Sequence, residues 1–143
     1  MSNLATIDKF ENVQIGAAIG PEQMFLSKEQ ARRYARACGL DAPRFTDDEG
    51  ARKEGLPGMI VPGNMSLGLL TKLVTDWIGQ SGARIVRIGT TYRVLVQPDH
   101  TISLQGFVTH TYPEERACEI DLWIENEDGE RMVTGTATVQ FPR

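Results

Sequence analysis

Apolar residues recur every three or four positions in one long stretch in the middle of the chain. Its apolar members are Met65, Leu69, Leu70, Leu73, Val74, Trp77 and Ile78. A period of about 3.6 residues predicts an α-helix, here about four turns long. Because this helix is the longest and most apolar one expected, we place it at the centre of the fold.

Beyond Gly82 the apolar residues alternate with polar ones, which is the pattern of β-strands. The first run has one parity, with Gln97–His100 as its closing turn, and consists of Val86, Ile88, Tyr92, Val94 and Val96. Three further runs span 102–108, 118–124 and 133–141, and Asn126–Gly129 reads as a hairpin turn between the last two. The C-terminal half is therefore predicted to be an antiparallel meander.

The N-terminal half carries helix signals. Glu22–Leu26 predicts a short edge strand, and Ser27 followed by Gln30 has the order of a capping box, opening a helix that runs to Cys38 and stops at Gly39. The acidic run Asp47–Glu49 predicts the start of a second short helix ending near Gly55, since carboxylates favour the positive end of the helix dipole.

Helices followed by a run of strands predict an α+β fold. One very apolar helix beside about five antiparallel strands suggests a sheet wrapped around that helix, which is the hotdog arrangement. The chain shows no fixed repeat, low-complexity tract or linker, so we expect a single domain over residues 1–143.

Composition narrows the function classes. With 143 residues, 41% of them apolar, the chain can bury one full core. It has no apolar run near the ~20 residues of a membrane span, and Met1–Asp8 lacks signal-peptide order, so we expect a soluble cytoplasmic protein. The net charge is −4, with positive residues scattered, which argues against nucleic acid as a partner.

Few residues could hold a cofactor. Cys38 and Cys118 lie outside any metal or redox spacing and are expected to be free thiols, while histidine occurs only as His100 and His110. No set of His, Cys and carboxylate residues has zinc-type spacing, so we expect neither a metal nor another cofactor.

The segment from Gly39 to Phe45 carries the main functional signal. It reads Gly-Leu-Asp-Ala-Pro-Arg-Phe and resembles the active-site segment Gly-Asp-x-Asn-Pro-x-His of MaoC-type enoyl-thioester hydratases, also called hydratase 2 or R-specific enoyl-CoA hydratases. Glycine and proline keep the family spacing. Leu40 stands at the aspartate position, Ala42 at the asparagine position and Phe45 at the histidine position.

Other stretches resemble the family in the same order. Met59–Gly63 is similar to the Pro-Ile-x-His-Gly segment before the central helix, with Pro62 at the histidine position. Tyr92–His100 resembles the family's strand and Pro-Gly-Asp turn, and Val133–Gly135 its closing strand. The resemblance extends from about Gln14 to Phe141.

The resemblance implies a site with half of its machinery. In active members the aspartate and histidine activate a water that adds to C3 of a trans-2-enoyl thioester, and a backbone N–H at the start of the central helix polarises the carbonyl. Gly63 would supply that N–H. Leu40 and Phe45 cannot move a proton, and losing a contribution of ~10²–10⁴-fold should leave little turnover. The implied substrate-binding residues are Phe45, Asp47, Pro62, Gly63 and Asn64.

Hotdog domains pair through their sheets, and some MaoC relatives are heteromers in which one half lacks the acid–base pair. The resemblance therefore implies a subunit that binds acyl-CoA or acyl-ACP thioesters, is catalytically deficient alone, and forms a homodimer, or a heterodimer or heterotetramer with another hotdog subunit. The expected joint activity is that of an enoyl-thioester hydratase or 3-hydroxyacyl dehydratase, a lyase.

Two alternatives stay open. The first is a homodimeric hydratase, dehydratase or thioesterase that works with non-standard residues, for which Asp41, Asn64 and His110 are candidates. Asp41 could enter the site by a register slip or be a solvated loop residue, and Asn64 could cap the helix or face the thioester. His110 shares the parity of Val108 and could turn inward. The second alternative is a non-catalytic binder of hydrophobic ligands.

Overall fold

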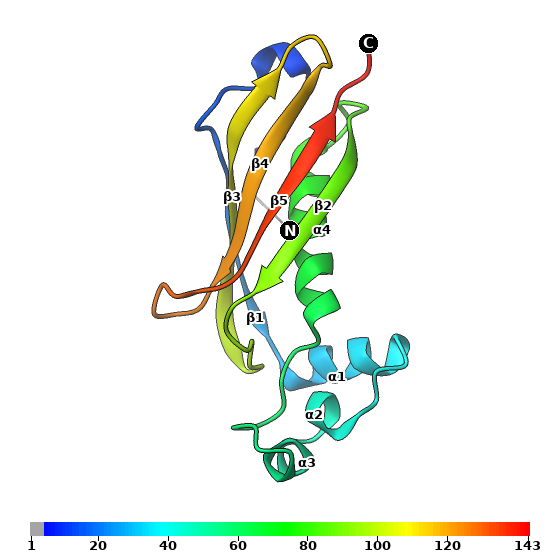
Figure 1. Cartoon of the computed structure of the whole chain (residues 1–143), viewed down its shortest axis with the longest axis vertical. Helices are drawn as coiled ribbons and strands as arrows, with labels where there is room; N and C mark the ends of the chain where they lie inside the picture. The colour runs from blue at the N-terminus through cyan, green and yellow to red at the C-terminus, as the bar shows by residue number, and fades with distance from the viewer. Residues whose placement is uncertain (1–4) are drawn as a thin grey trace.

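The computed structural model describes residues 5–143. Figure 1 shows α1 to α3 grouped at the end of the molecule where the long helix α4 begins, with the sheet running alongside α4. In chain order the elements are η1 (Phe10–Asn12), β1 (Ala18–Leu26), α1 (Lys28–Ala37), α2 (Pro43–Thr46), α3 (Asp48–Lys53), α4 (Gly63–Ile78), β2 (Arg84–Tyr92), β3 (His100–Tyr112), β4 (Ala117–Glu125) and β5 (Arg131–Gln140).

The five strands form one antiparallel sheet in the order β1-β3-β4-β5-β2. One face of the sheet packs against α4, because alternate residues of the three central strands are apolar and buried. The main members of this buried set are Ile102, Leu104, Val108, Ile120, Leu122, Ile124, Val133, Ala137 and Val139. The expected α+β hotdog arrangement is confirmed.

The apolar period from Met65 to Ile78 marks a helix in the core, as predicted. Its buried apolar side chains are Met65, Leu70, Leu73, Val74, Trp77 and Ile78. Pro62 is the N-cap, and the helix stops at Gly79, whose φ of 55° lies in the left-handed region that a side chain disfavours.

The local signals before the central helix are also confirmed. Ser27 and Gln30 form both bonds of the capping box at the start of α1, and Asp47 accepts a hydrogen bond from the Gly50 N–H at the start of α3. We did not predict α2, which is a single helical turn that begins at Pro43. β1 lies at an edge of the sheet, as expected, but starts at Ala18 rather than Glu22.

The prediction for the first strand after the central helix was partly wrong. β2 ends at Tyr92, so Val94 and Val96 lie outside it. The shared parity predicted for this run also fails at Val86, which is 47% exposed. A register shift between Ile85 and Arg87 changes the faces to which the side chains point, and within residues 5–143 β2 is an edge strand with no strand on its outer side.

No helix within residues 5–143 has both the length and the apolarity to cross a lipid bilayer.

Candidate functional site at the start of the central helix

A pocket of about 340 Å³ lies where α4 begins. Its walls come from α2, the segment that leads into α4, the first turn of α4, and the chain that leaves β2. The lining residues are mostly apolar: Phe45, Ile60, Val61, Gly63, Ser66, Tyr92, Arg93, Val94, Leu95 and Val96. Such a cavity, apolar with a few polar groups, suits an organic ligand.

Backbone hydrogen bonds join three of these parts of the chain. The Val61 N–H donates to the Val96 carbonyl at 2.8 Å, which joins the segment before α4 to the chain after β2. The Ile60 N–H donates to the Arg44 carbonyl at 2.8 Å, which joins the same segment to α2. The second of these bonds holds α2, which carries Phe45, against the segment before α4.

Polar side chains attach α2 and α3 to the rest of the molecule. The Arg32 Nε donates to the Thr46 carbonyl at 2.8 Å. Asp48 accepts from the Met59 N–H at 2.9 Å and pairs with the Lys28 Nζ at 2.8 Å. The Lys28 ammonium first, and then the Met59 N–H, lower the pKa of the Asp48 carboxyl below its ordinary value.

The flat face of the Tyr92 ring covers Gly63. A Cβ atom built on Gly63 would lie 3.0 Å from the ring Cζ and 3.3 Å from both Cε atoms. The near-equal distances put the hydroxyl end of the ring directly over the glycine. This close approach excludes any larger side chain at residue 63 unless the ring moves.

Two of the residues implied by the family motifs meet in this pocket. Phe45, at the histidine position, and Gly63, the expected N–H donor, both line it. Pro62 is the buried N-cap of α4, directly before Gly63. Asn64 is exposed and is not a lining residue, and the N-cap of α4 is Pro62 rather than Asn64.

The remaining positions of the active-site segment lie outside the lining. Leu40 is half-buried, and its N–H closes the end of α1 by donating to the Ala35 carbonyl at 2.7 Å. Asp41 is exposed. Asp47 is the cap of α3, with its carboxylate 2.7 Å from the Gly50 N.

Neither histidine lines the pocket. His110 is exposed, because a register shift between Val108 and His110 breaks the parity that would have turned it inward. Its Nδ1 lies 3.0 Å from the Thr109 Oγ1, and its ring stacks on Tyr112. His100 is exposed, as expected, and its Nδ1 lies 3.1 Å from the Glu127 Oε1.

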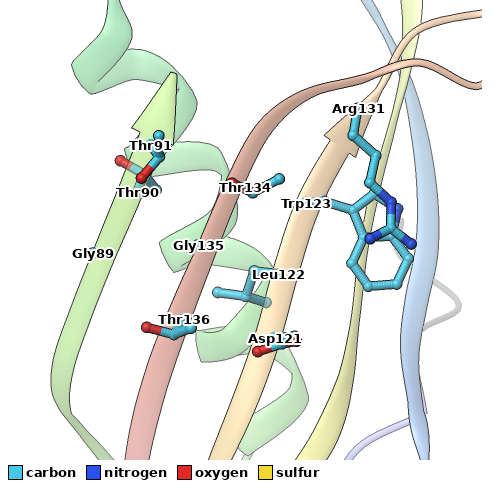
Figure 2. A pocket seen from close by; sticks show the side chains of 10 residues that line it. All are labelled: Gly89, Thr90, Thr91, Asp121, Leu122, Trp123, Arg131, Thr134, Gly135 and Thr136. Carbon is cyan, nitrogen blue, oxygen red and sulfur yellow. The ribbon is translucent and has the colours of Figure 1, made fainter. Parts of the chain in front are cut away.

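A second depression, of about 540 Å³, lies on the sheet face that points away from α4 (Figure 2). Its floor is made by glycine and threonine residues of β2 and β5. At one side the Arg131 guanidinium lies over the Trp123 ring, 4.0 Å from its centroid, as Figure 2 shows. Asp121 is the only carboxylate in its lining, which offers no acid–base pair for chemistry.

Of the ten lining residues, the motifs assigned Phe45 and Gly63 to the substrate site, and those that they left out include Ser66 and Tyr92. Ser66 follows Gly63 by three residues in a helix, a spacing that puts both on one face and could have indicated its place. Tyr92 was predicted only as a strand residue; it ends β2 and is 50% exposed. Its contact with Gly63 depends on where β2 ends, which no local pattern records.

Cysteine and metal chemistry lie apart from this site. Cys38 is an exposed free thiol. Cys118 is a buried residue of β4, and burial raises the pKa of its thiol to about 11. Within residues 5–143, no group of three or more His, Cys, Asp or Glu residues is arranged to hold a metal ion.

An antiparallel sheet around one central helix, with a pocket at the start of that helix, defines a hotdog-fold domain. Residues 10–119 match the MaoC like domain family, and this chain belongs to that family. No curated protein sequence matches the chain.

Solved structures share the fold at low sequence identity. One from the ChsH1–ChsH2 complex of Mycobacterium tuberculosis is 22% identical, with a TM-score of 0.82 over 90% of this chain and 98% of its own. The (R)-hydratase from A. caviae involved in PHA biosynthesis is 17% identical, with a TM-score of 0.84 over 92% and 99%. One from the HadBC (3R-hydroxyacyl-ACP dehydratase) complex of M. tuberculosis is 19% identical, with a TM-score of 0.71 over 88% and 96%.

Proposed function

We propose that this chain is an acyl-thioester-binding MaoC-like subunit that lacks its own proton shuttle. Its catalytic role then depends on a partner chain that carries the Asp/His pair. Together the two would hydrate an enoyl thioester or dehydrate a 3-hydroxyacyl thioester.

The observation that carries this proposal is the position of Phe45 beside Gly63. A phenyl ring stands in the pocket at the position where the family motif has histidine. It can contact an acyl chain but cannot accept or return a proton. Asp41, Asn64 and His110, the candidates for a stand-alone enzyme, are all exposed and none lines the pocket, which favours the deficient subunit over that alternative.

The pocket retains what is needed for binding. The first N–H groups of an α-helix have no partner within the helix, and the helix dipole favours partial negative charge there, as on a carbonyl oxygen. Phe45, Ile60 and Leu95 supply apolar surface for the acyl chain, and exposed Arg93 lies in the lining, where it could meet the phosphates of coenzyme A.

The edge of the sheet supports a second subunit. Among residues 5–143, β2 pairs with β5 alone. Val86 and Tyr92 of β2, and Leu95 just after it, are each about half exposed. Two of the similar structures, ChsH1–ChsH2 and HadBC, are complexes of two named chains. A pair through β2 would lie next to the pocket, because Tyr92 ends β2 and also lines the pocket, as does Arg93 directly after it.

Co-expression with a dyad-bearing MaoC-like chain from the same genome tests the proposal. We expect a stable mixed pair in gel filtration that hydrates crotonyl-CoA faster than the partner alone. A chain that forms only homodimers and binds acyl-CoA without turnover would instead support the non-catalytic binder. A chain that binds no acyl-CoA and no partner would contradict the proposal.

A further inference from the structure

Ser66 is the one polar side chain that is fully buried among residues 5–143. It is 2% exposed, and it lies in the first turn of α4. It also lines the pocket that contains Gly63 and Phe45. A buried hydroxyl in an otherwise apolar core needs a reason, because burial of a polar group is costly unless it is hydrogen-bonded.

The rest of the described chain does not satisfy this hydroxyl. Two other hydroxyls of α4, on Thr71 and Thr75, donate to carbonyls one turn back, at 2.7 Å to Leu67 and 2.8 Å to Thr71. Ser66 makes no side-chain hydrogen bond to another residue of 5–143, and its Oγ keeps some contact with solvent. The Ser66 hydroxyl is therefore left to bond to a ligand in the pocket that it lines.

Ser66 and Gly63 present donors to the same space. Residues three apart in a helix lie on one face, and both line the pocket. The Gly63 N–H belongs to the first turn, where no carbonyl of the helix can accept it. The Tyr92 ring lies against Gly63 and lines the same pocket, so it narrows the approach to Gly63.

We propose that the Ser66 hydroxyl and the Gly63 N–H together bind one oxygen of the ligand, the thioester carbonyl. This assignment deepens the proposed function and rests on it. Two donors match the two lone pairs of a carbonyl oxygen. Ser66 is thus a binding residue that selects acyl thioesters over ligands of the same shape without the carbonyl.

The test compares Ser66→Ala with Thr75→Ala, which removes a hydroxyl from the same helix outside the pocket. The probes are butyryl-CoA and S-butyl-CoA, a thioether that lacks only the carbonyl oxygen, and binding is measured by calorimetry. We expect Ser66→Ala to weaken butyryl-CoA binding about tenfold and leave S-butyl-CoA binding unchanged. Thr75→Ala should change neither affinity.

Thermal unfolding separates binding from a structural role. Because the hydroxyl has no hydrogen-bond partner among residues 5–143, Ser66→Ala should leave the unfolding midpoint unchanged or raise it. Equal losses of affinity for both probes, no loss for butyryl-CoA, or a clear drop in the midpoint would each overturn the assignment.

The two proposals can fail separately. If the wild-type chain binds neither coenzyme A derivative, the proposed function fails, and the Ser66 assignment is then judged with S-ethyl hexanethioate, which has no carrier. In an NMR titration this thioester should shift the Gly63 amide resonance of the wild type, and Ser66→Ala should need about tenfold more of it for the same shift. No shift in the wild type would reject the oxygen site as well.

Discussion

The packing of Tyr92 on Gly63 limits what residue 63 can be. The ring atoms lie 3.0–3.3 Å from the position of a Cβ, so alanine would push the ring outward. Glycine at this position is therefore required by the packing of the pocket wall. Since Tyr92 also belongs to the exposed end of β2, the same ring links the pocket to the sheet edge.

Restoring the missing pair should restore chemistry. Phe45→His places an imidazole in the pocket lining, and Leu40→Asp returns a carboxylate to the family's other position. We expect the double variant L40D/F45H to hydrate crotonyl-CoA, with a gain of about 10²-fold over the wild-type background. L40N/F45H is the matched control and should gain less; equal rates for both variants would mean that the carboxylate is not used.

At the scale of elements, α2 and α3 pack so closely that Gly50 has no room for a side chain. A Cβ there would lie 2.5 Å from the Pro43 Cβ and 3.0 Å from the Asp47 Oδ2. Proline cannot rotate away, so a substitution must shift α2. Because α2 carries Phe45, this contact connects helix packing to the pocket wall.

We predict that Gly50→Ala destabilises the protein by about 1–3 kcal/mol through overpacking. Gly68→Ala is the control, since it lies on the exposed side of α4 with nothing within 4 Å of the new methyl group. It should stabilise the protein by up to about 1 kcal/mol. Urea unfolding measures both, and similar effects of the two variants would refute the close-packing argument.

The Lys28–Asp48 pair makes the attachment of α3 sensitive to acid. The folded state lowers the pKa of Asp48, so its contribution is present above the ordinary carboxyl pKa of about 4 and is lost as the pH falls through the folded value. Asp48→Asn should therefore be less stable than wild type at pH 7, and the difference should shrink below pH 4. Thermal unfolding from about pH 7 to pH 3 checks this; a constant difference would argue against the ion pair.

Elements with strong local signals could be predicted from the sequence. The capping box at Ser27, the cap at Asp47 and the apolar period of α4 each depend on residues within a few turns. The end of β2 and the turn of His110 to the surface could not, because each follows a register shift between paired strands. Such a shift depends on the neighbouring strand and leaves no mark in the alternation itself.

The site could likewise be predicted only where a local motif indicated a residue. Motif spacing indicated Gly63 and Phe45, which the fold brings together in one pocket. It also suggested Asp47, Pro62 and Asn64 as ligand contacts, and none of these three is among the residues that line that pocket. Ser66 and Tyr92 were missed because their burial and contacts arise only when α4 meets the chain leaving β2.

For the whole molecule, the open edge at β2 is the feature that a partner would cover. Its outer hydrogen-bonding groups have no strand beside them among residues 5–143, and Val86 adds apolar surface. Natural sheet proteins block such edges with lysine. An apolar residue here instead favours pairing with another subunit.

Val86→Lys should therefore weaken subunit pairing at least about tenfold, because a lysine on an edge strand disfavours strand addition. Ile15→Lys is the control, since Ile15 is 65% exposed and precedes β1, at the other edge of the sheet. Sedimentation measures the mass of each variant. Loss of pairing in Ile15→Lys and not in Val86→Lys would place the interface elsewhere.

The most direct measurement is crotonyl-CoA hydration by the purified chain alone, with binding followed in parallel by calorimetry. We predict that the chain alone binds crotonyl-CoA and forms no 3-hydroxybutyryl-CoA above the uncatalysed rate. Sustained hydration by the lone chain, unchanged when Phe45 is replaced by leucine, would contradict it, because the catalytic groups would then lie outside the assigned pocket.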